Sequence, residues 1–217
     1  MDGPRLLVFG DIHGAISKLH AVLKRVEPTD ADTLLFLGDY IDRGEDSKAV
    51  LDSLIALERR HRCIFLKGNH EDMLLTAIDG GSDEWTLWLL NGGLTTLRDF
   101  RSVMPPDPYV AWIRALRTHH ETETHYFVHA GLRPGVPPAE STDAERLWIR
   151  EPFLSSPYDW GKRVVFGHTM QLGGPLVQPN KIGIDTGACM SRVGRLTCLV
   201  LPAAEFVFSR GHPRPVD

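Results

Sequence analysis

The sequence predicts an α/β fold, because short apolar runs alternate with amphipathic helical patterns along the first part of the chain. Apolar runs typical of buried strands cover residues 5–9, 33–37 and 63–66. Each run leads into a glycine-containing polar loop, and successive loops lie about 30 residues apart, the length of one strand–helix–strand unit. Together these observations predict a sheet with right-handed crossovers, in which the loops return to one edge.

Amphipathic helices are predicted between these strands. Residues 15–26 and residues 48–60 each repeat apolar side chains at helical spacing, which builds an apolar face. Asp46 or Ser47 is placed to cap the second helix. Both segments therefore fit the alternating strand–helix pattern.

The middle of the chain differs, because helical patterns follow one another there without intervening strands. They cover residues 71–78, 83–90, 94–101 and 109–117, with a break at Pro105-Pro106. Three of the five tryptophans lie in this region, namely Trp85, Trp88 and Trp112. Their helical spacing favours the core of a helical insert over stacking against a ligand.

Strands return in the second half of the chain. The candidates are residues 125–129, 163–166, 181–184, 195–201 and 205–209. The last three lie close together with turn residues between them, which predicts a hairpin-like second sheet. Because the sequence shows no repeat, linker or low-complexity segment, we expect residues 1–217 to form one domain.

Composition and charge narrow the class of protein. The 217 residues are 42% hydrophobic and 24% charged, which is ordinary for a soluble globular protein. No apolar run reaches about 18 residues and the N-terminus lacks the pattern of a secretion signal, so we expect no membrane partner. Three cysteines without a pairing pattern predict buried thiols in a reducing cytoplasm. The net charge of −4 argues against nucleic acid as the main partner and leaves the oligomeric state open.

Potential metal ligands stand at the ends of five apolar segments. The first three loops read GDIHG at residues 10–14, GDYIDRG at 38–44 and GNHE at 68–71. His129 and His168 follow two later strand candidates. Singly, such an Asp is commonly a helix cap or turn residue, and such a His is commonly structural. Repeated at five strand ends, where α/β sheets form their sites, they predict one metal centre.

These motifs resemble those of the calcineurin-like metallophosphoesterases, and within them the bacterial and phage branch of the serine/threonine phosphoprotein phosphatases. The resemblance runs from residue 10 to about residue 186. It implies a central β-sandwich flanked by helices, with an active site between the sheets that holds two divalent metal ions. Mixed oxygen and imidazole ligands suit Mn, with Fe or Zn as alternatives, better than Ca.

The resemblance also assigns the metal ligands. The first ion would be held by Asp11, His13 and Asp39. Asp39 would bridge to the second ion, whose other ligands would be Asn69, His129 and His168. A hydroxide bridging the two ions would attack the phosphoester directly.

Four further residues receive roles from the resemblance. His70 would protonate the leaving alkoxide as general acid, and Asp42 would hold its imidazole oriented and protonated. Arg43 would make forked hydrogen bonds to substrate phosphate oxygens, a geometry that Lys cannot reproduce. Arg150, which ends the segment LWIR, would supply a second phosphate-binding arginine, or else is a solvated surface side chain.

Several polar residues are interpreted as lying outside the catalytic set. Residues 119–125 carry three histidines in a polar run, which we interpret as a solvated surface at a helix end. Asp185 is interpreted as a turn residue or one that supports the ligands, and Glu71 as a first-turn acid favourable to the helix dipole. Asn91-Gly92-Gly93 is interpreted as a loop that shapes the cleft.

Three functions remain open. The first is a serine/threonine protein phosphatase, a metal-dependent phosphomonoesterase that acts on a phosphoprotein or phosphopeptide. The second is a dinucleoside-polyphosphate hydrolase of the diadenosine tetraphosphate type, whose members often lack the acid before the arginine of the second motif. Asp42-Arg43 is intact here, which favours the first function. The third is a non-catalytic scaffold, which is disfavoured because all six ligand positions and His70 are retained.

Overall fold

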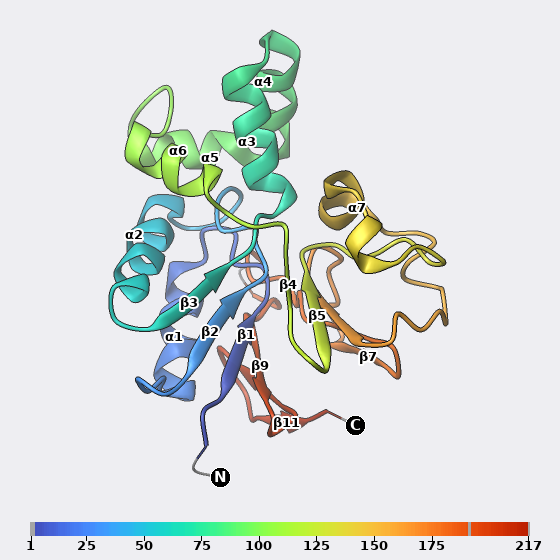
Figure 1. Cartoon of the computed structure of the whole chain (residues 1–217). Coiled ribbons are helices and arrows are strands. Elements are labelled where there is room, and N and C mark those ends of the chain that lie inside the picture. The colour runs from blue at the N-terminus through green and yellow to red at the C-terminus, as the bar shows by residue number, and fades with distance from the viewer. Residues whose placement is uncertain (1–2, 191, 217) are drawn as a thin grey trace.

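Two β-sheets with helices around them make up the protein in the computed structural model, which describes residues 3–190 and 192–216 (Figure 1). The first sheet runs in the order β11 (Arg214–Pro215), β10 (Glu205–Phe208), β9 (Thr197–Leu201), β1 (Leu6–Phe9), β2 (Thr33–Phe36) and β3 (Arg62–Phe65). The second runs in the order β4 (His119–Glu121), β5 (His125–Val128), β6 (Arg163–Phe166), β8 (Lys181–Gly183) and β7 (Leu176–Gln178). This architecture confirms the predicted α/β fold.

The three N-terminal strands form as the alternating pattern predicts. β1 pairs with β2, and β2 with β3, in parallel. The crossovers are α1 (Ile16–Val26) and α2 (Ser47–Glu58). Asp46 is the residue that caps α2, because its carboxylate accepts a hydrogen bond from the Ala49 amide at 2.8 Å. The carboxyl ends of the three strands, and the loops after them, therefore meet at one edge of the sheet.

The predicted hairpin-like second sheet is wrong. β9 and β10 do form a hairpin, but β9 pairs antiparallel with β1 in the first sheet. β8 lies in the second sheet, between β6 and β7. Apolar side chains from both sheets form one buried cluster, which includes Val8, Ile182 and Leu199. Strand periodicity shows which side chains are buried, but it does not show which of two facing sheets receives a strand.

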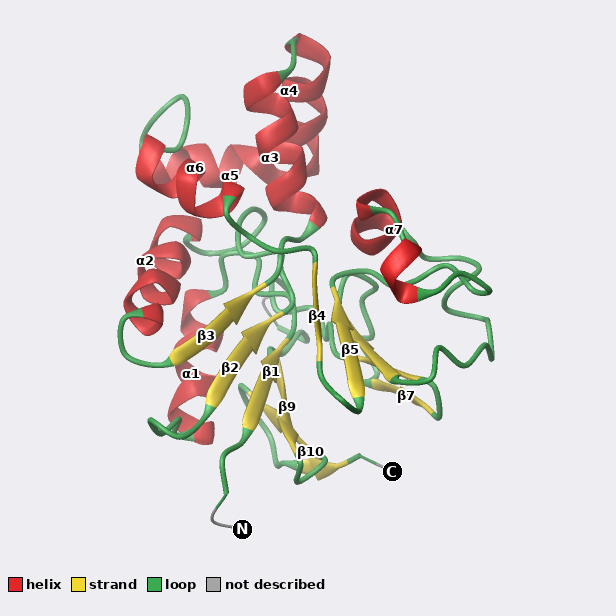
Figure 2. Ribbon diagram, viewed as in Figure 1, coloured by secondary structure: helices red, strands yellow, loops and turns green. Residues whose placement is uncertain are grey.

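A helical insert between β3 and β4 stands beyond the carboxyl ends of β1–β3 (Figure 2). It consists of α3 (Asn69–Asp79), α4 (Ser82–Trp88), the kinked π-helical turn η1 (Leu89–Gly93), α5 (Leu94–Phe100) and α6 (Asp107–Arg114). Trp88 is fully buried, and Trp85 and Trp112 pack against the same core, as the helical spacing predicts. The insert therefore covers the edge of the sheet at which the polar loops meet.

The sequence analysis did not predict one of the helices. α7 (Asp143–Trp148) follows the short 3-10 turn η2 (Pro138–Glu140). The Thr142 hydroxyl accepts a hydrogen bond from the Glu145 amide at 3.2 Å, and the Glu145 carboxylate accepts one from the Thr142 amide at 2.9 Å. This reciprocal pair is a capping box, so the sequence TDAE carried a usable signal for the start of α7.

The interpretation of residues 119–125 as the end of a helix is also corrected. The first three of these residues form strand β4, which pairs antiparallel with β5, and not the end of a helix. His119 is half-buried and stacks on the Tyr126 ring with 5.4 Å between ring centroids. His119 and His120 therefore belong to the edge strand β4, and His125 begins the neighbouring strand β5.

The structure also describes the cysteines and the length of the helices. All three cysteines are free thiols; Cys198 is buried, whereas Cys63 and Cys189 are only half-buried. Within the described ranges, no helix has the length and apolar character needed to cross a lipid bilayer.

Candidate active site

The six predicted metal ligands come together between the two sheets, on loops that follow β1, β2, β3, β5 and β6. All six side chains are buried: Asp11, His13, Asp39, Asn69, His129 and His168. Three of them, His13, Asp39 and His168, have φ angles of 48°, 52° and 60°, in the left-handed region that non-glycine residues rarely adopt. Such turns re-aim side chains after a strand, and strained backbone of this kind gathers at functional sites.

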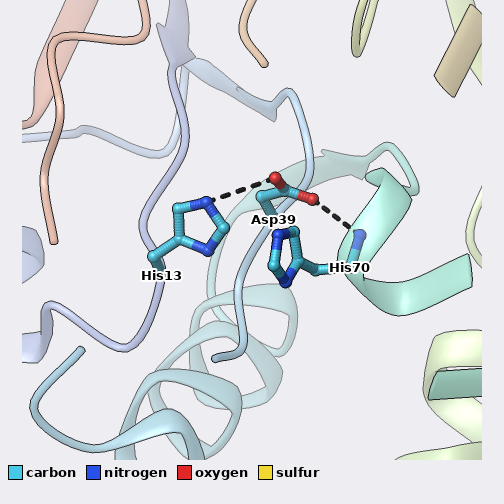
Figure 3. Close-up of side chains that lie close together, drawn as sticks. All are labelled: His13, Asp39 and His70. Atoms are coloured by element: carbon cyan, nitrogen blue, oxygen red, sulfur yellow. Dashed lines mark hydrogen bonds and ion pairs between the residues drawn. The ribbon is translucent and has the colours of Figure 1, made fainter. Parts of the chain in front are cut away.

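Asp39 lies at the centre of this cluster. One of its carboxylate oxygens is 3.3 Å from Nε2 of His13, and the other is 3.5 Å from Nε2 of His129. The same carboxylate accepts a hydrogen bond from the backbone amide of His70 at 3.0 Å (Figure 3). Burial favours the neutral acid, but the interactions of the carboxylate with the imidazoles of His129, His70 and His13 outweigh it and hold the Asp39 pKa well below its usual range.

The potential ligand atoms form two groups that share Asp39. One group is His13, Asp39 and His70, and the other is Asp39, His129 and His168. Within each group the ligand atoms lie within 4.8 Å of one another. A single carboxylate common to two groups has the geometry of a bridging ligand.

Backbone carbonyls fix the orientation of two histidines. Nδ1 of His13 lies 3.0 Å from the Ile41 carbonyl oxygen, and Nδ1 of His129 lies 3.0 Å from that of Leu37. A carbonyl only accepts, so each Nδ1 carries the proton and each Nε2 presents a lone pair to the cluster. Metal-binding histidines are held in the same way.

The contacts of the Asn69 side chain also favour a bound cation. Its Oδ1 lies 2.9 Å from Nε2 of His129, so two hydrogen-bond acceptors face each other. Oδ1 is also 2.8 Å from Nδ1 of His168. Burial lowers the His129 pKa, and burial with the nearby His129 lowers the His168 pKa to about 3. Both rings are therefore neutral near pH 7, the form in which imidazole binds a metal.

Asp11 lies at the edge of this cluster, beside the backbone of His168. Its carboxylate accepts a hydrogen bond from the His168 backbone amide at 2.9 Å, and it belongs to neither group of close ligand atoms. Burial raises the Asp11 pKa, and the charges of Asp185 and Asp39 raise it further. Buried carboxylates that repel one another call for compensating positive charge, so Asp11 still adds to the fit with bound cations.

Glu71 holds the loops of the candidate site together by contacts that the sequence did not reveal. Its buried carboxylate accepts hydrogen bonds from the backbone amides of Gly68, Asp39 and Tyr40 at 2.9, 2.9 and 2.8 Å. Burial, followed by the Asp39 charge, raises the Glu71 pKa to about 7. Glu71 thus joins the second and third motifs and shapes the loop that carries Asp39. The available signal was its place three residues after Gly68, where a Glu can bond back to the start of a helix.

His70 and Asp42 form a buried pair next to the cluster. Nδ1 of His70 lies 2.7 Å from Oδ2 of Asp42. Nε2 of His70 is buried and has no hydrogen-bond partner among the described residues. The pair therefore leaves one imidazole nitrogen free beside the ring of His13, whose centroid is 4.6 Å away.

The two arginines lie at the exposed side of the site. Nη1 of Arg43 is 3.1 Å from Nε2 of His13, and its Nε donates to the Asn91 carbonyl at 3.3 Å. Arg150 is exposed, and its charge is one of the smaller causes that lower the His168 pKa, after burial and His129. Arg43 thus stands where solvent meets the buried ligands, and Arg150 is a second exposed cation whose charge acts on His168.

Comparisons with known proteins show which family the chain resembles. A family model described as calcineurin-like phosphoesterase matches residues 4–172. The chain is 34% identical over 208 residues to serine/threonine-protein phosphatase 1 of Salmonella typhimurium, with 88% of each chain covered. It is 23% identical over 236 residues to the asymmetrical bis(5'-nucleosyl)-tetraphosphatase PrpE of Anoxybacillus flavithermus, covering 92% of this chain and 91% of the relative.

Solved structures share the fold. A protein proposed to be a diadenosine tetraphosphatase superposes with a TM-score of 0.74 at 24% identity, covering 96% of this chain and 93% of its own. The cold-active protein-tyrosine phosphatase of a psychrophilic Shewanella superposes with a TM-score of 0.67 at 17% identity, covering 100% of this chain and 83% of its own. At these identities the likeness establishes the two-sheet architecture and not the substrate.

Proposed function

The chain belongs to the calcineurin-like phosphoesterase family, and from this membership we propose that it is a metal-dependent phosphomonoesterase acting on phosphoserine or phosphothreonine in proteins. The observation that carries the proposal is the position of Asp39, whose carboxylate is common to two groups of buried ligand atoms. The donor set of carboxylate, amide and imidazole suits Mn, Fe or Zn, and Mn is the ion that we propose.

The metal ligands of the proposal are the six residues of the buried cluster. One ion would be held by Asp11, His13 and Asp39. The other would be held by Asp39, Asn69, His129 and His168. Two divalent ions bound there would supply Lewis acidity toward the phosphoryl oxygens and lower the pKa of a water that attacks phosphorus.

The chain itself would supply the proton for the leaving group. As the bond between phosphorus and the serine or threonine oxygen breaks, Nε2 of His70 gives its proton to that oxygen. Asp42 holds the other nitrogen, Nδ1, at 2.7 Å, which fixes the ring in one orientation. General acid catalysis of this kind contributes about 10²–10⁴-fold to a rate.

Arg43 and Arg150 would bind the phosphate. A guanidinium presents paired N–H donors that match two phosphate oxygens. Arg43 is oriented by the Asn91 carbonyl, and the charge of Arg150 acts on the His168 imidazole. Both remain exposed, as groups that meet a substrate from solvent must be.

A dinucleoside-polyphosphate hydrolase is the second candidate, because one relative and one solved structure carry that description. The 34% identical serine/threonine-protein phosphatase and the intact Asp42–His70 pair favour the phosphomonoesterase. The deciding experiment compares kcat/KM of the Mn²⁺-loaded protein for phosphoserine and phosphothreonine peptides with that for diadenosine tetraphosphate. We expect the phosphopeptides to be preferred, and a preference for the dinucleotide would replace this proposal with the second candidate.

A further inference from the structure

The helical insert reaches the catalytic pair through two hydrogen bonds to Asp42. The Trp88 indole N–H donates to Oδ2 of Asp42 at 3.0 Å, beside the bond from His70. The Thr96 hydroxyl donates to the other oxygen, Oδ1, at 2.6 Å. These donors lie 46 and 54 residues away from Asp42 along the chain, on α4 and α5.

Hydrogen-bond donors contact both oxygens of the Asp42 carboxylate. Asp42, His70 and Thr96 are all fully buried, so solvent cannot replace a missing donor. The Thr96 hydroxyl also accepts a hydrogen bond from the Asp42 backbone amide at 3.1 Å. It therefore contacts both the main chain and the side chain of Asp42. With a donor on each oxygen, the carboxylate cannot rotate without breaking one of these bonds.

The turn between α4 and α5 is shaped to the same segment. The Gly92 carbonyl faces the Arg43 amide at 3.5 Å, and the Asn91 carbonyl accepts from Arg43 Nε. Gly92 has φ of 118°, and a Cβ there would lie 2.8 Å from Cγ of Arg43. Only glycine fits this approach. The insert therefore contacts Asp42 and Arg43 at once.

Packing also fixes the Trp88 ring. A Cβ on Gly93 would lie 2.6 Å from the Trp88 indole carbons, so the ring rests directly on the glycine backbone. The Trp85 ring contacts it from the same helix, with 5.2 Å between ring centroids. The indole N–H is thereby aimed at Asp42, and burial prevents Trp88 from stacking against a substrate.

We propose that Trp88 and Thr96 are positioning residues, which hold Asp42 and through it the proton-donating imidazole of His70. The inference rests on the proposed function, because it concerns the proton given to the leaving oxygen. It assigns the helical insert a part in the chemical step, in addition to covering the edge of the sheet.

The test uses two substrates that differ in their need for that proton. A phosphoserine peptide releases an alkoxide, which must be protonated as the bond to phosphorus breaks. The aryl ester para-nitrophenyl phosphate releases a stable phenolate that needs little protonation. The variants are Trp88→Phe, which removes the N–H and keeps an aromatic ring, and Thr96→Val, which removes the hydroxyl and keeps the shape.

We expect each variant to lower kcat on the phosphoserine peptide by about 10-fold, part of the contribution of a general acid. On para-nitrophenyl phosphate kcat should remain within about 2-fold, since the acid contributes little there. KM and bound metal should stay unchanged for both. Thr96→Ser restores the hydroxyl and should recover the peptide activity. Trp112→Phe, a half-buried tryptophan of α6 whose N–H donates to Glu58 rather than to Asp42, is the matched control and should behave as wild type.

Equal losses on both substrates would reduce Trp88 and Thr96 to structural residues and overturn the inference, as would an unchanged kcat in both variants. The Thr96→Val and Thr96→Ser pair decides the matter if Trp88→Phe does not fold. Metal-loaded wild type that hydrolyses neither substrate would instead overturn the proposed function.

Discussion

Nδ1 of His70 lies 2.7 Å from Oδ2 of Asp42, and neither side chain is exposed to solvent. An imidazole held in this way cannot turn without breaking its contact with Asp42. The contact leaves Nε2 as the only ring atom able to exchange a proton with a substrate. The contribution of His70 to catalysis can therefore be separated from metal binding.

His70→Asn should lower kcat on phosphopeptides by about 10²–10⁴-fold, because the leaving alkoxide loses its proton donor. Bound metal, measured by elemental analysis, should be nearly unchanged. The exposed His20 on α1 provides the control, and His20→Asn should retain full activity. Loss of both metals from His70→Asn would show that this residue is a ligand and contradict its assigned role.

Asp39→Asn should impair both metal sites at once. Its carboxylate is shared by the two groups of ligand atoms, and an amide is neutral and offers only one acceptor oxygen. Elemental analysis should show a fall in the content of both ions, whereas Asp30→Asn, at an exposed position, should bind metal as wild type does. Full retention of one ion would place Asp39 in a single site.

Glu71→Gln should weaken metal binding although Glu71 is not proposed as a ligand. Its carboxylate accepts amide hydrogen bonds from both the second and third motifs, which the single acceptor of an amide cannot reproduce. Supporting residues of this kind typically change metal affinity about 10–100-fold. Isothermal titration with Mn²⁺ measures the effect, and Glu123→Gln on the exposed surface is the control. Unchanged affinity would mean that the loop holds its shape without Glu71.

The gathering of the proposed ligands at one site could be predicted because each stands at the end of an apolar strand, where parallel strands bring their loops together. The sequence did not predict that Glu71 bonds to Asp39 and Tyr40, because these contacts depend on how β2 and β3 lie side by side. The contact between Trp88 and Asp42 depends in the same way on how α4 packs against the loop after β2. Local patterns locate strand ends and apolar faces, whereas such contacts arise only when distant segments pack.

The assignment of strands to sheets was missed for a similar reason. Residues 181–183 and 197–201 both read as buried strands, yet they lie in different sheets. The apolar layer between the sheets accepts side chains from either side, so the pattern of burial is the same for both.

Asp32→Asn should reduce stability in a pH-dependent manner. Asp32 is buried and accepts hydrogen bonds from Nη2 of Arg5 at 2.6 Å and from the Thr29 amide at 2.8 Å. The bond from Arg5 holds the Asp32 pKa well below its usual range. The stabilisation is therefore present above the unfolded-state pKa of about 3.9 and is lost as the pH falls below it.

Near neutral pH the variant should lose about 2 kcal/mol of free energy of unfolding. The difference between variant and wild type should shrink progressively as the pH falls below about 4. Urea denaturation at several pH values measures both quantities. A difference that does not vary with pH would mean that the ionised carboxylate contributes nothing.

Metal removal and restoration tests the central claim most directly. Protein stripped of metal with a chelator is titrated with Mn²⁺ while hydrolysis of a phosphoserine peptide is followed. We expect the stripped protein to be inactive and full activity to return as two molar equivalents of Mn²⁺ bind to each chain. Full activity in the stripped protein, or none after Mn²⁺ or another transition metal is bound, would contradict the binuclear phosphoesterase account.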